Sequence, residues 1–302
     1  MSELRWHPLL EEWVTLAPWR QDRTYHPPAE HCPLCPTRPG MPETEIPEPD
    51  YHIVVFENKF PSYSGDQGRA EVVCYTPSHD SSLGEQSVDH IRDLIDVWRD
   101  RTRELGGMRN VRYVYVFENR GEVIGVTLSH PHGQIYAYPF VPPTIERELA
   151  AEARHMRRTR RCLYCDVIEG ESEGVRTVLR DERWIAFVPA FARWPFEVHL
   201  APVRHRGDLL DLDEDDDASF ASTLKGVLQK YDRLFGFPLP YVMAMHQKPP
   251  GRGGRHHHFH VEFYPPNRTH DKLKYLAGSE IGAGAFILDT RAEDTAAELR
   301  AL

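Results

Sequence analysis

The sequence is poor in net positive charge, in cysteine and in long apolar runs. Its 302 residues include 36 Lys and Arg against 46 Asp and Glu, a formal net charge of −10 at pH 7. Affinity for a nucleic-acid backbone comes mainly from clustered positive charge, so this balance argues against a nucleic-acid partner. No apolar run approaches the roughly 18 residues of a membrane span, and the acidic start MSELRWHPLLEEWV lacks the apolar core of a signal peptide. We therefore expect a cytoplasmic protein with no membrane partner.

Only five cysteines are present, and four of them form two CxxC pairs, Cys32 with Cys35 and Cys162 with Cys165. In a cytosolic protein such pairs are more often metal ligands or redox centres than structural disulfides. The fifth, Cys74, lies in the strand-like stretch EVVCYTP, where we expect a small buried hydrophobe.

Three features of the chain recur at nearly one interval. The two CxxC pairs, the histidines that follow the EVVCYTPSH and EVHLAPVRH strands, and the HPH and HFH motifs each repeat after 126 to 130 residues. Such a repeat predicts two related halves, which we place at residues 1–150 and 151–302.

The elements between these features agree with a repeat. Apolar residues at helical spacing predict amphipathic helices at 87–107 and 217–236, each followed by a β-rich run. A helical connector is expected at 138–161 and a terminal helix at 290–302. Because no βαβ alternation is visible, we expect an α+β fold with a mostly antiparallel sheet, in which both halves pack as one unit.

Each half combines its CxxC pair with two histidines, which is the ligand set of a structural zinc site. Four protein ligands leave no open position for water, so both ions are expected to be structural. Reduced cysteines beside unrelated histidines remain an alternative, above all in the second half, where the RHHHFH run offers other ligands. A redox pair is disfavoured because no thioredoxin-like unit is present. The predicted ligands are Cys32, Cys35, His79 and His130 in the first half, and Cys162, Cys165, His205 and His258 in the second.

In the segment SHPHGQIYAY, His130 and His132 are separated by one proline. An extended chain projects both side chains to the same side of the strand. A zinc ion on His130 would fix the backbone and so hold the imidazole of His132 in place, although His132 does not itself bind the metal. A positioned neutral imidazole is a nucleophile for phosphorus or a general base. Gln134 follows on the same side and could hydrogen-bond a phosphate oxygen, while Gly133 lets a phosphate approach the backbone. We therefore predict His132 and Gln134 as catalytic residues; two solvent-facing loop histidines are the alternative.

The motifs CPLC, TPSH, FENRGEVIGVTLS, HPHGQ, RWPFEVHLAP and FHVEFYPP together resemble the galactose-1-phosphate uridylyltransferases, a branch of the histidine-triad superfamily. The resemblance runs from about residue 12 to residue 280. It implies two tandem histidine-triad-like halves on one sheet, a homodimer and a ping-pong reaction. In that reaction His132 attacks the α-phosphorus of UDP-glucose and expels glucose 1-phosphate. Galactose 1-phosphate then takes the uridylyl group from the histidine.

The resemblance also implies which residues bind the substrates. Two arginines three positions apart line the family's nucleotide site, the FEN segments lie around the nucleotide, and KYLAGSE is similar to the segment that holds the hexose phosphate. The implied residues are Arg20, Arg23, Asn58, Asn119 and Thr127 for the nucleotide and phosphates, and Lys274 and Glu280 for the hexose phosphate.

The sequence departs from some relatives at a second metal site, which they build from one glutamate and three histidines. The matching residues here are Glu148, His246, His260 and Glu262, with Glu262 in place of the last histidine. Because the second cysteine pair offers another set, we expect the second zinc there in preference to the Glu/His site. His260 stands in the nucleophile's place in the second half but lacks the Gly-Gln pair. That half is expected to be non-catalytic or to serve the sugar end of the site.

Other functions remain open at this point. The same chemistry could act on another nucleotide sugar, as in an adenylyl transferase or a phosphorylase acting on ADP-glucose. A nucleotide hydrolase is disfavoured, because transfer requires that water be kept from the intermediate. A catalytically silent, zinc-stabilised nucleotide-binding protein is disfavoured by the intact His-Gly-Gln motif.

Overall fold

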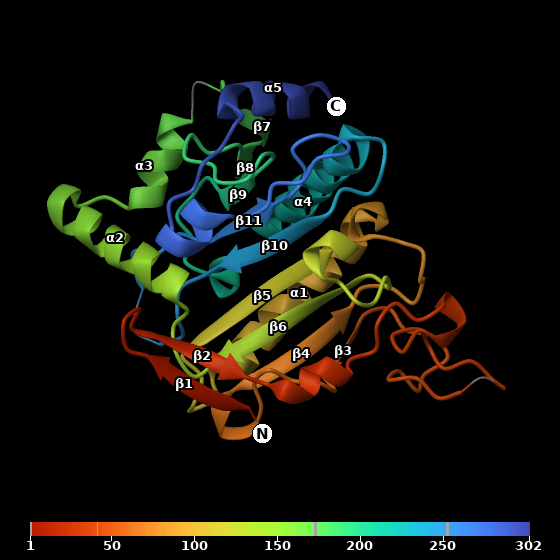
Figure 1. Cartoon of the computed structure of the whole chain (residues 1–302). Coiled ribbons are helices and arrows are strands. Elements are labelled where there is room, and N and C mark those ends of the chain that lie inside the picture. Colours follow the sequence, from red (N-terminus) through yellow and green to blue (C-terminus); the bar gives the residue numbers. More distant parts are fainter. Residues whose placement is uncertain (1, 41, 172–173, 252–253) are drawn as a thin grey trace.

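The computed structural model describes residues 2–40, 42–171, 174–251 and 254–302, and its centre is a nine-stranded sheet (Figure 1). Every pair of neighbouring strands in the sheet is antiparallel. The strands in spatial order are β3 (Val54–Glu57), β4 (Arg69–Cys74), β6 (His132–Tyr138), β5 (Tyr113–Arg120), β10 (Tyr241–His246), β11 (His260–Tyr264), β9 (Val198–Pro202), β8 (Trp184–Phe187) and β7 (Thr177–Arg180).

The order of the strands is mirrored about the middle of the sheet. Strands β4, β6 and β5 of the first half are followed by β10, β11 and β9 of the second half, so the corresponding strands meet at the β5–β10 pair. In that pair Asn119 lies opposite Val242. The predicted α+β class and the shared antiparallel sheet are thereby confirmed.

Five α-helices accompany the sheet in the described residues: α1 (Val88–Gly106), α2 (Pro143–Thr159), α3 (Leu163–Gly170), α4 (Glu214–Leu234) and α5 (Ala292–Ala301). Helices α1 and α4 pack against each other on one face of the sheet, behind it in Figure 1. The apolar stripe of α1 is fully buried there, as the spacing of Ile91, Leu94 and Trp98 requires. The main core of the molecule therefore lies between these two helices and the sheet.

Capping residues set where the two long helices begin. Ser87 accepts a hydrogen bond from the backbone N–H of His90, so α1 begins at the predicted place. Helix α4 begins at Glu214, three residues before the predicted start. Asp213 accepts from the N–H of Asp216, whose side chain accepts in return from the N–H of Asp213. Four acidic residues in the first turn also suit the positive end of the helix.

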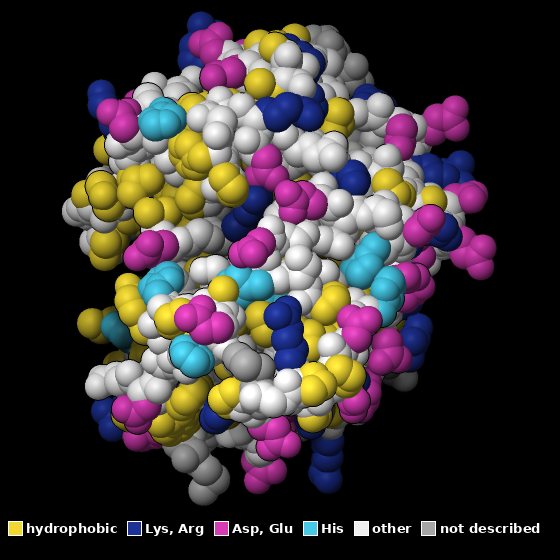
Figure 2. Space-filling model, turned by 90° about the vertical axis from the view of Figure 1, so that its right-hand side faces the viewer, with side chains coloured by type: hydrophobic (Ala, Val, Ile, Leu, Met, Phe, Trp, Pro, Cys, Tyr) yellow, Lys and Arg dark blue, Asp and Glu magenta, His cyan; other side chains and the backbone are white. Residues whose placement is uncertain are grey.

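The other face of the sheet carries a separate hairpin, β1 (Glu3–His7) and β2 (Glu12–Leu16), in front of the sheet in Figure 1. Leu4 of the hairpin packs on an aromatic cluster that includes Tyr63, Phe117 and Tyr136. Within the described ranges, none of the helices has the length and apolar character needed to cross a bilayer. On the side of the molecule shown in Figure 2, several histidines gather across the middle, and basic side chains lie among acidic ones.

Candidate active site and metal centres

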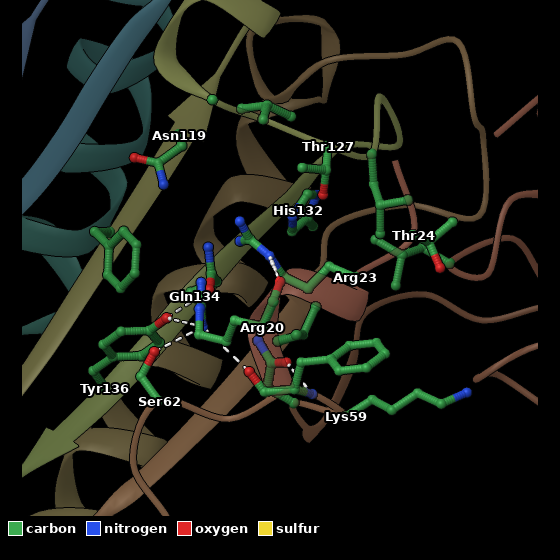
Figure 3. A pocket seen from close by; sticks show the side chains of 18 of the residues that line it. Arg20, Arg23, Thr24, Lys59, Ser62, Asn119, Thr127, His132, Gln134 and Tyr136 are labelled. Atoms are coloured by element: carbon green, nitrogen blue, oxygen red, sulfur yellow. Dashed lines mark hydrogen bonds between the residues drawn. The ribbon is translucent and has the colours of Figure 1, made fainter. Parts of the chain in front are cut away.

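A cavity of about 580 Å³ opens on the hairpin-bearing face of the sheet. Its floor is formed by alternate side chains of β5 and β6, and loops before β3 and before β6 form its walls (Figure 3). The structure brings together in its lining seven of the residues expected at the active site: Arg20, Arg23, Asn58, Asn119, Thr127, His132 and Gln134.

His132, the first residue of β6, is held in one orientation by its own backbone. Its Nδ1–H donates to the carbonyl oxygen of His130 at 2.7 Å. Burial lowers the pKa of His132, so the ring is neutral at pH 7. With the proton on Nδ1, the lone pair on Nε2 remains available to attack an electrophile.

Gln134 is positioned by the aromatic side chain that follows it on the same side of β6. The Tyr136 hydroxyl donates to Gln134 Oε1 at 3.2 Å, which leaves the amide N–H groups of Gln134 for a ligand. Arg20 in turn donates from Nη1 to Ser62 Oγ at 2.7 Å and to the Tyr136 oxygen at 3.3 Å. The amide and one guanidinium of the cavity therefore belong to a single hydrogen-bonded chain.

Arg20 and Arg23 place two positive charges on one wall of the cavity. They belong to the turn at 18–23, and Arg23 Nε donates to the carbonyl oxygen of Arg20 at 3.0 Å. Burial and the neighbouring charge of Arg20 lower the pKa of Arg23. Two guanidinium groups in a partly buried wall repel each other, and a bound anion would compensate both charges. This wall therefore suits a phosphate.

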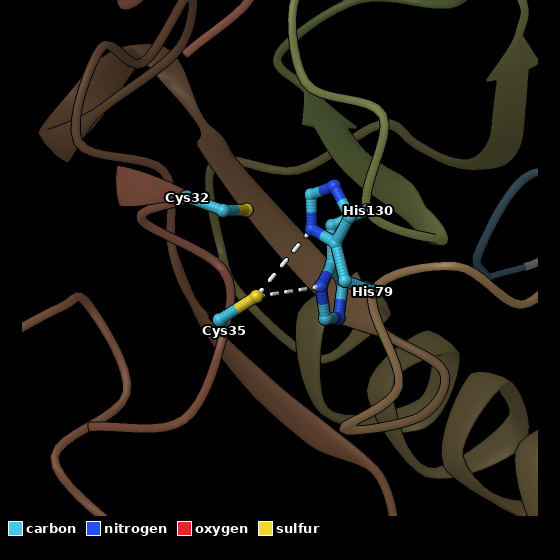
Figure 4. Close-up of side chains that lie close together, drawn as sticks. All are labelled: Cys32, Cys35, His79 and His130. Atoms are coloured by element: carbon cyan, nitrogen blue, oxygen red, sulfur yellow. Dashed lines mark hydrogen bonds between the residues drawn. The ribbon is translucent and has the colours of Figure 1, made fainter. Parts of the chain in front are cut away.

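The first predicted metal set converges beside the cavity (Figure 4). Cys35 Sγ lies 3.4 Å from His79 Nδ1 and 3.5 Å from His130 Nδ1, and the four ligand atoms, with Cys32, lie within 4.8 Å of one another. A zinc ion about 2.3 Å from sulfur and about 2.0 Å from nitrogen holds tetrahedral ligands roughly 3.3–3.8 Å apart, so these residues fit zinc. The other ring nitrogen of His130 contacts the Thr76 carbonyl oxygen at 2.8 Å, as is usual for metal-binding histidines.

The second set repeats this geometry in the other half of the chain. Cys165 Sγ lies 3.4 Å from His258 Nδ1 and 3.8 Å from His205 Nδ1, and Cys162 completes a group whose ligand atoms are within 4.8 Å. His258 Nε2 contacts the Pro202 carbonyl oxygen at 2.8 Å, just as His130 contacts Thr76. The set therefore fits a second ion of the same kind.

A third group forms between α2 and strands β10 and β11. Glu148, His246, His260 and Glu262 bring their ligand atoms within 4.8 Å of one another. His246 Nδ1 lies 3.0 Å from Glu148, and His260 Nε2 lies 3.3 Å from Glu262. This group and the second cysteine set share no residue, and the ligand atoms of both converge, so the two arrangements exist side by side. His199 Nε2, 3.3 Å from Glu262, extends the group and was not foreseen.

Two expected substrate residues do not line the cavity. Lys274 and Glu280 lie near each other in the segment before α5, with Lys274 Nζ 3.5 Å from a Glu280 carboxylate oxygen. The structure also shows residues that sequence reasoning missed, namely Ser62 and Tyr136. Tyr136 could have been inferred, since it follows Gln134 by two positions and a strand repeats every second residue.

The fold and the cavity define a class of protein: a doubled α+β chain with an imidazole and two arginines in the lining of one cavity, and with Cys/His sets whose geometry could hold metal ions. The family model of the galactose-1-phosphate uridyl transferase N-terminal domain matches residues 62–142, and that of the C-terminal domain matches residues 151–302. The galactose-1-phosphate uridylyltransferase of Thermotoga maritima is 40% identical to this chain, over 99% of this chain and 98% of that protein. The chain belongs to the galactose-1-phosphate uridylyltransferase family.

Solved structures show the same relationship. One described as a uridylyltransferase superposes with a TM-score of 0.90 at 34% identity, covering 100% of this chain and 98% of the other. An ADP-glucose phosphorylase from Arabidopsis thaliana with bound ADP-glucose superposes with a TM-score of 0.79 at 25% identity, covering 100% and 99%.

Proposed function

We propose that this chain is an enzyme that moves UMP from UDP-glucose to galactose 1-phosphate, as its family membership supports, and that His132 carries the uridylyl group. The observation that carries the role of His132 is its position in the cavity: a neutral ring with its Nδ1–H bonded and its Nε2 free, facing Gln134 and two arginines. No other histidine lines this cavity in the described part of the chain.

The reaction proceeds in two displacements at one phosphorus. His132 Nε2 forms a bond to the α-phosphorus of UDP-glucose while the bond from that phosphorus to the oxygen of glucose 1-phosphate breaks. A phosphate oxygen of galactose 1-phosphate then attacks the same phosphorus, the nitrogen–phosphorus bond breaks and UDP-galactose leaves. One site thus serves both sugar phosphates in turn.

The charge that gathers on the non-bridging oxygens is stabilised by groups already in place. The free N–H of Gln134 donates to one such oxygen, and Arg20 and Arg23 lie on the wall where the phosphates enter. Because Tyr136 and Ser62 fix the Gln134 amide and Arg20, little reorganisation accompanies the transition state. Asn58, Asn119 and Thr127 complete the nucleotide and phosphate contacts.

The two cysteine-containing sets hold structural zinc, one ion in each of the halves 1–150 and 151–302. The geometry of both sets supports this assignment, and bound zinc would contribute folding free energy. Zinc on His130 also fixes the backbone carbonyl that orients His132.

The protein acts in the cytoplasm as a homodimer, with UDP-glucose and hexose 1-phosphates as its partners. Lys274 and Glu280 hold the hexose phosphate in this proposal. Because both residues lie outside the cavity of their own chain, they would reach it only from the second copy.

The covalent intermediate provides the test. The protein is incubated with UDP-glucose labelled in the uridine, digested and analysed by mass spectrometry, and galactose 1-phosphate is then added. We expect a uridylylated peptide containing His132 that loses its label on addition of the acceptor. A folded, zinc-loaded protein that acquires no label would contradict the proposal.

A second candidate function is supported by the ADP-glucose phosphorylase among the similar structures. The same histidine would then carry an adenylyl group. Thermal stabilisation by UDP and UMP compared with ADP and AMP at equal concentrations separates the two, because the ligand that binds more tightly raises the melting temperature further. Greater stabilisation by the adenine nucleotides would favour the second function.

A further inference from the structure

Glu118 is a buried carboxylate that the proposed reaction does not use. It lies in β5 between Phe117 and Asn119, whose side chains line the cavity, so Glu118 points to the opposite, helix-covered face of the sheet. Only 5% of Glu118 is exposed. A carboxylate in such a place is costly unless it is hydrogen-bonded, so its partners indicate its role.

Two tyrosine hydroxyls donate to this carboxylate from the neighbouring strands. Tyr75, the residue after β4, donates to Oε2 at 3.3 Å, and Tyr241, the first residue of β10, donates to Oε1 at 3.2 Å. Both tyrosines are fully buried. Glu118 therefore joins a strand of the first half to a strand of the second.

Tyr75 contacts the segment that carries His132 on both sides of that residue. Its backbone N–H donates to the carbonyl oxygen of Pro131 at 3.3 Å. Its hydroxyl lies directly against Gly133, because a Cβ atom built on this glycine would be 2.2 Å from the Tyr75 oxygen. The position of the Tyr75 ring thus determines where the backbone of residues 131–133 can lie.

We propose that Glu118 and Tyr75 are positioning residues for the nucleophile: the carboxylate holds the Tyr75 hydroxyl against Gly133, and this contact fixes the direction in which His132 faces the phosphorus. The inference rests on the proposed role of His132. Its physical basis is that nucleophilic attack requires the reacting atoms about 3–3.5 Å apart and aligned, so a small backbone shift at His132 slows the chemical step.

Tyr241 provides a matched control within the same network. Its hydroxyl donates to the same carboxylate over a similar distance and is equally buried. Among the atoms nearest to a Cβ on Gly133, however, are those of Tyr75 and Phe117 and none of Tyr241. A loss of stability should follow from removing either hydroxyl, whereas a loss of rate should follow only from removing that of Tyr75.

The experiment compares Tyr75→Phe, Tyr241→Phe and Glu118→Gln in the full-length, zinc-loaded protein. We measure the single-turnover rate of uridylyl transfer from UDP-glucose to the enzyme, the KM for UDP-glucose, the zinc content and the melting temperature. For Tyr75→Phe we expect the rate to fall about tenfold, since a displacement of about 1 Å can cost on the order of a hundredfold. The KM and zinc content should stay near those of the wild type. Tyr241→Phe should react at nearly the wild-type rate.

Equal rates for the two phenylalanine variants, or rates that follow the melting temperature in all three, would overturn the positioning role. If Tyr75→Phe does not fold, the result for Glu118→Gln tests the inference. Slower uridylyl transfer to the enzyme at unchanged KM supports the positioning role, and a wild-type rate overturns it. His132→Ala is measured in parallel. Covalent labelling of that variant would refute the role of His132 itself, which is a different outcome from equal rates in the tyrosine variants.

Discussion

His130 and His132 are separated by one residue, and their imidazole rings have different hydrogen-bond and ligand partners. His130 directs Nδ1 toward the cysteine sulfur, whereas His132 directs Nδ1–H to the His130 carbonyl oxygen and keeps Nε2 for the cavity. The same relation recurs between His258 and His260, where Nδ1 of the second histidine lies 2.8 Å from the carbonyl oxygen of the first. An ion bound to the first histidine, as proposed, would therefore orient the second in both halves.

Replacing His132 with alanine should abolish turnover while the protein keeps its metal and its fold. We expect activity below about a thousandth of the wild type, because the variant lacks the side chain that attacks UDP-glucose and carries the uridylyl group between the two steps. Activity, zinc content and melting temperature are measured together, with His52→Ala on an exposed surface as the control. Loss of zinc in His132→Ala would mean that the metal ligand and the nucleophile have been exchanged.

Glu118 should make the free energy of unfolding depend on pH. Burial raises the pKa of Glu118 to about 7, against the opposing effects of Arg120 and the two tyrosine hydroxyls, Tyr241 and Tyr75; the charge of Asp232 raises it further. Because the pKa is higher in the folded state than its ordinary value of 4.5, the favourable contribution is complete below about pH 4.5 and is lost as the pH rises to about 7.

The matching measurement is urea unfolding of the wild type and of Glu118→Gln at pH 4.5 and at pH 8. At roughly 1.4 kcal/mol per pKa unit, the wild type should lose about 3 kcal/mol relative to the variant between these pH values. Any hydrogen bond lost in Glu118→Gln changes its free energy of unfolding by the same amount at both pH values. Only the change of the difference between wild type and variant with pH therefore reports the titration of Glu118. A difference independent of pH would show that Glu118 does not titrate in this range.

At the scale of the element, the loop before β3 depends on its metal set. Cys32 is buried in a small cluster with Leu34, Ile46, Val72 and Cys74, which attaches the loop to β4. This cluster is separate from the main core and is too small to order a long loop alone. With zinc bound as proposed, the ion and the cluster would together hold the wall of the cavity.

Cys32→Ser should therefore lower the melting temperature strongly and halve the zinc content. The binding free energy of structural zinc sites reaches on the order of 10 kcal/mol and becomes folding free energy, so even partial loss is large. Cys74→Ala is the control, because Cys74 is as buried as Cys32 but belongs to no metal set in the described residues. Unchanged melting of Cys32→Ser would argue against the first zinc.

At the scale of the whole molecule, the two halves share their backbone plan but carry different side chains at matching positions. The register of β4 with β6 pairs Val72 with Gln134, and that of β9 with β11 pairs His199 with Glu262. The Glu262 carboxylate therefore occupies in the second half the place that the Gln134 amide has in the first, where we propose that it faces a phosphate. A negative charge there would repel a phosphate, and His260 is itself fully enclosed.

Each chain should consequently accept one uridylyl group and no more. Intact-mass analysis after exposure to excess UDP-glucose should show a single addition, on His132. A second addition, or a label on His260, would show that the second half also reacts.

The sequence was informative where a short motif or an internal repeat marks the residues that act together. The metal sets, the helix cap at Ser87 and the paired histidines follow from local spacing and a repeat. The partners of Glu118 could not be foreseen, because Tyr75 and Tyr241 meet it only through the pairing of strands distant in sequence. Spacing alone could not show that Glu148 lies beside His246 for a related reason: α2 has to be packed against the sheet before Glu148 reaches His246.

The pairing of β5 with β10 has a consequence for dividing the protein. Fragments cut at the connector between the halves would each present a long strand with unpaired backbone N–H and C=O groups, and β5 alone spans eight residues. Such free edges recruit other chains and favour aggregation. The gene is therefore best expressed intact, and a split version would regain its shape only if both pieces were synthesised together.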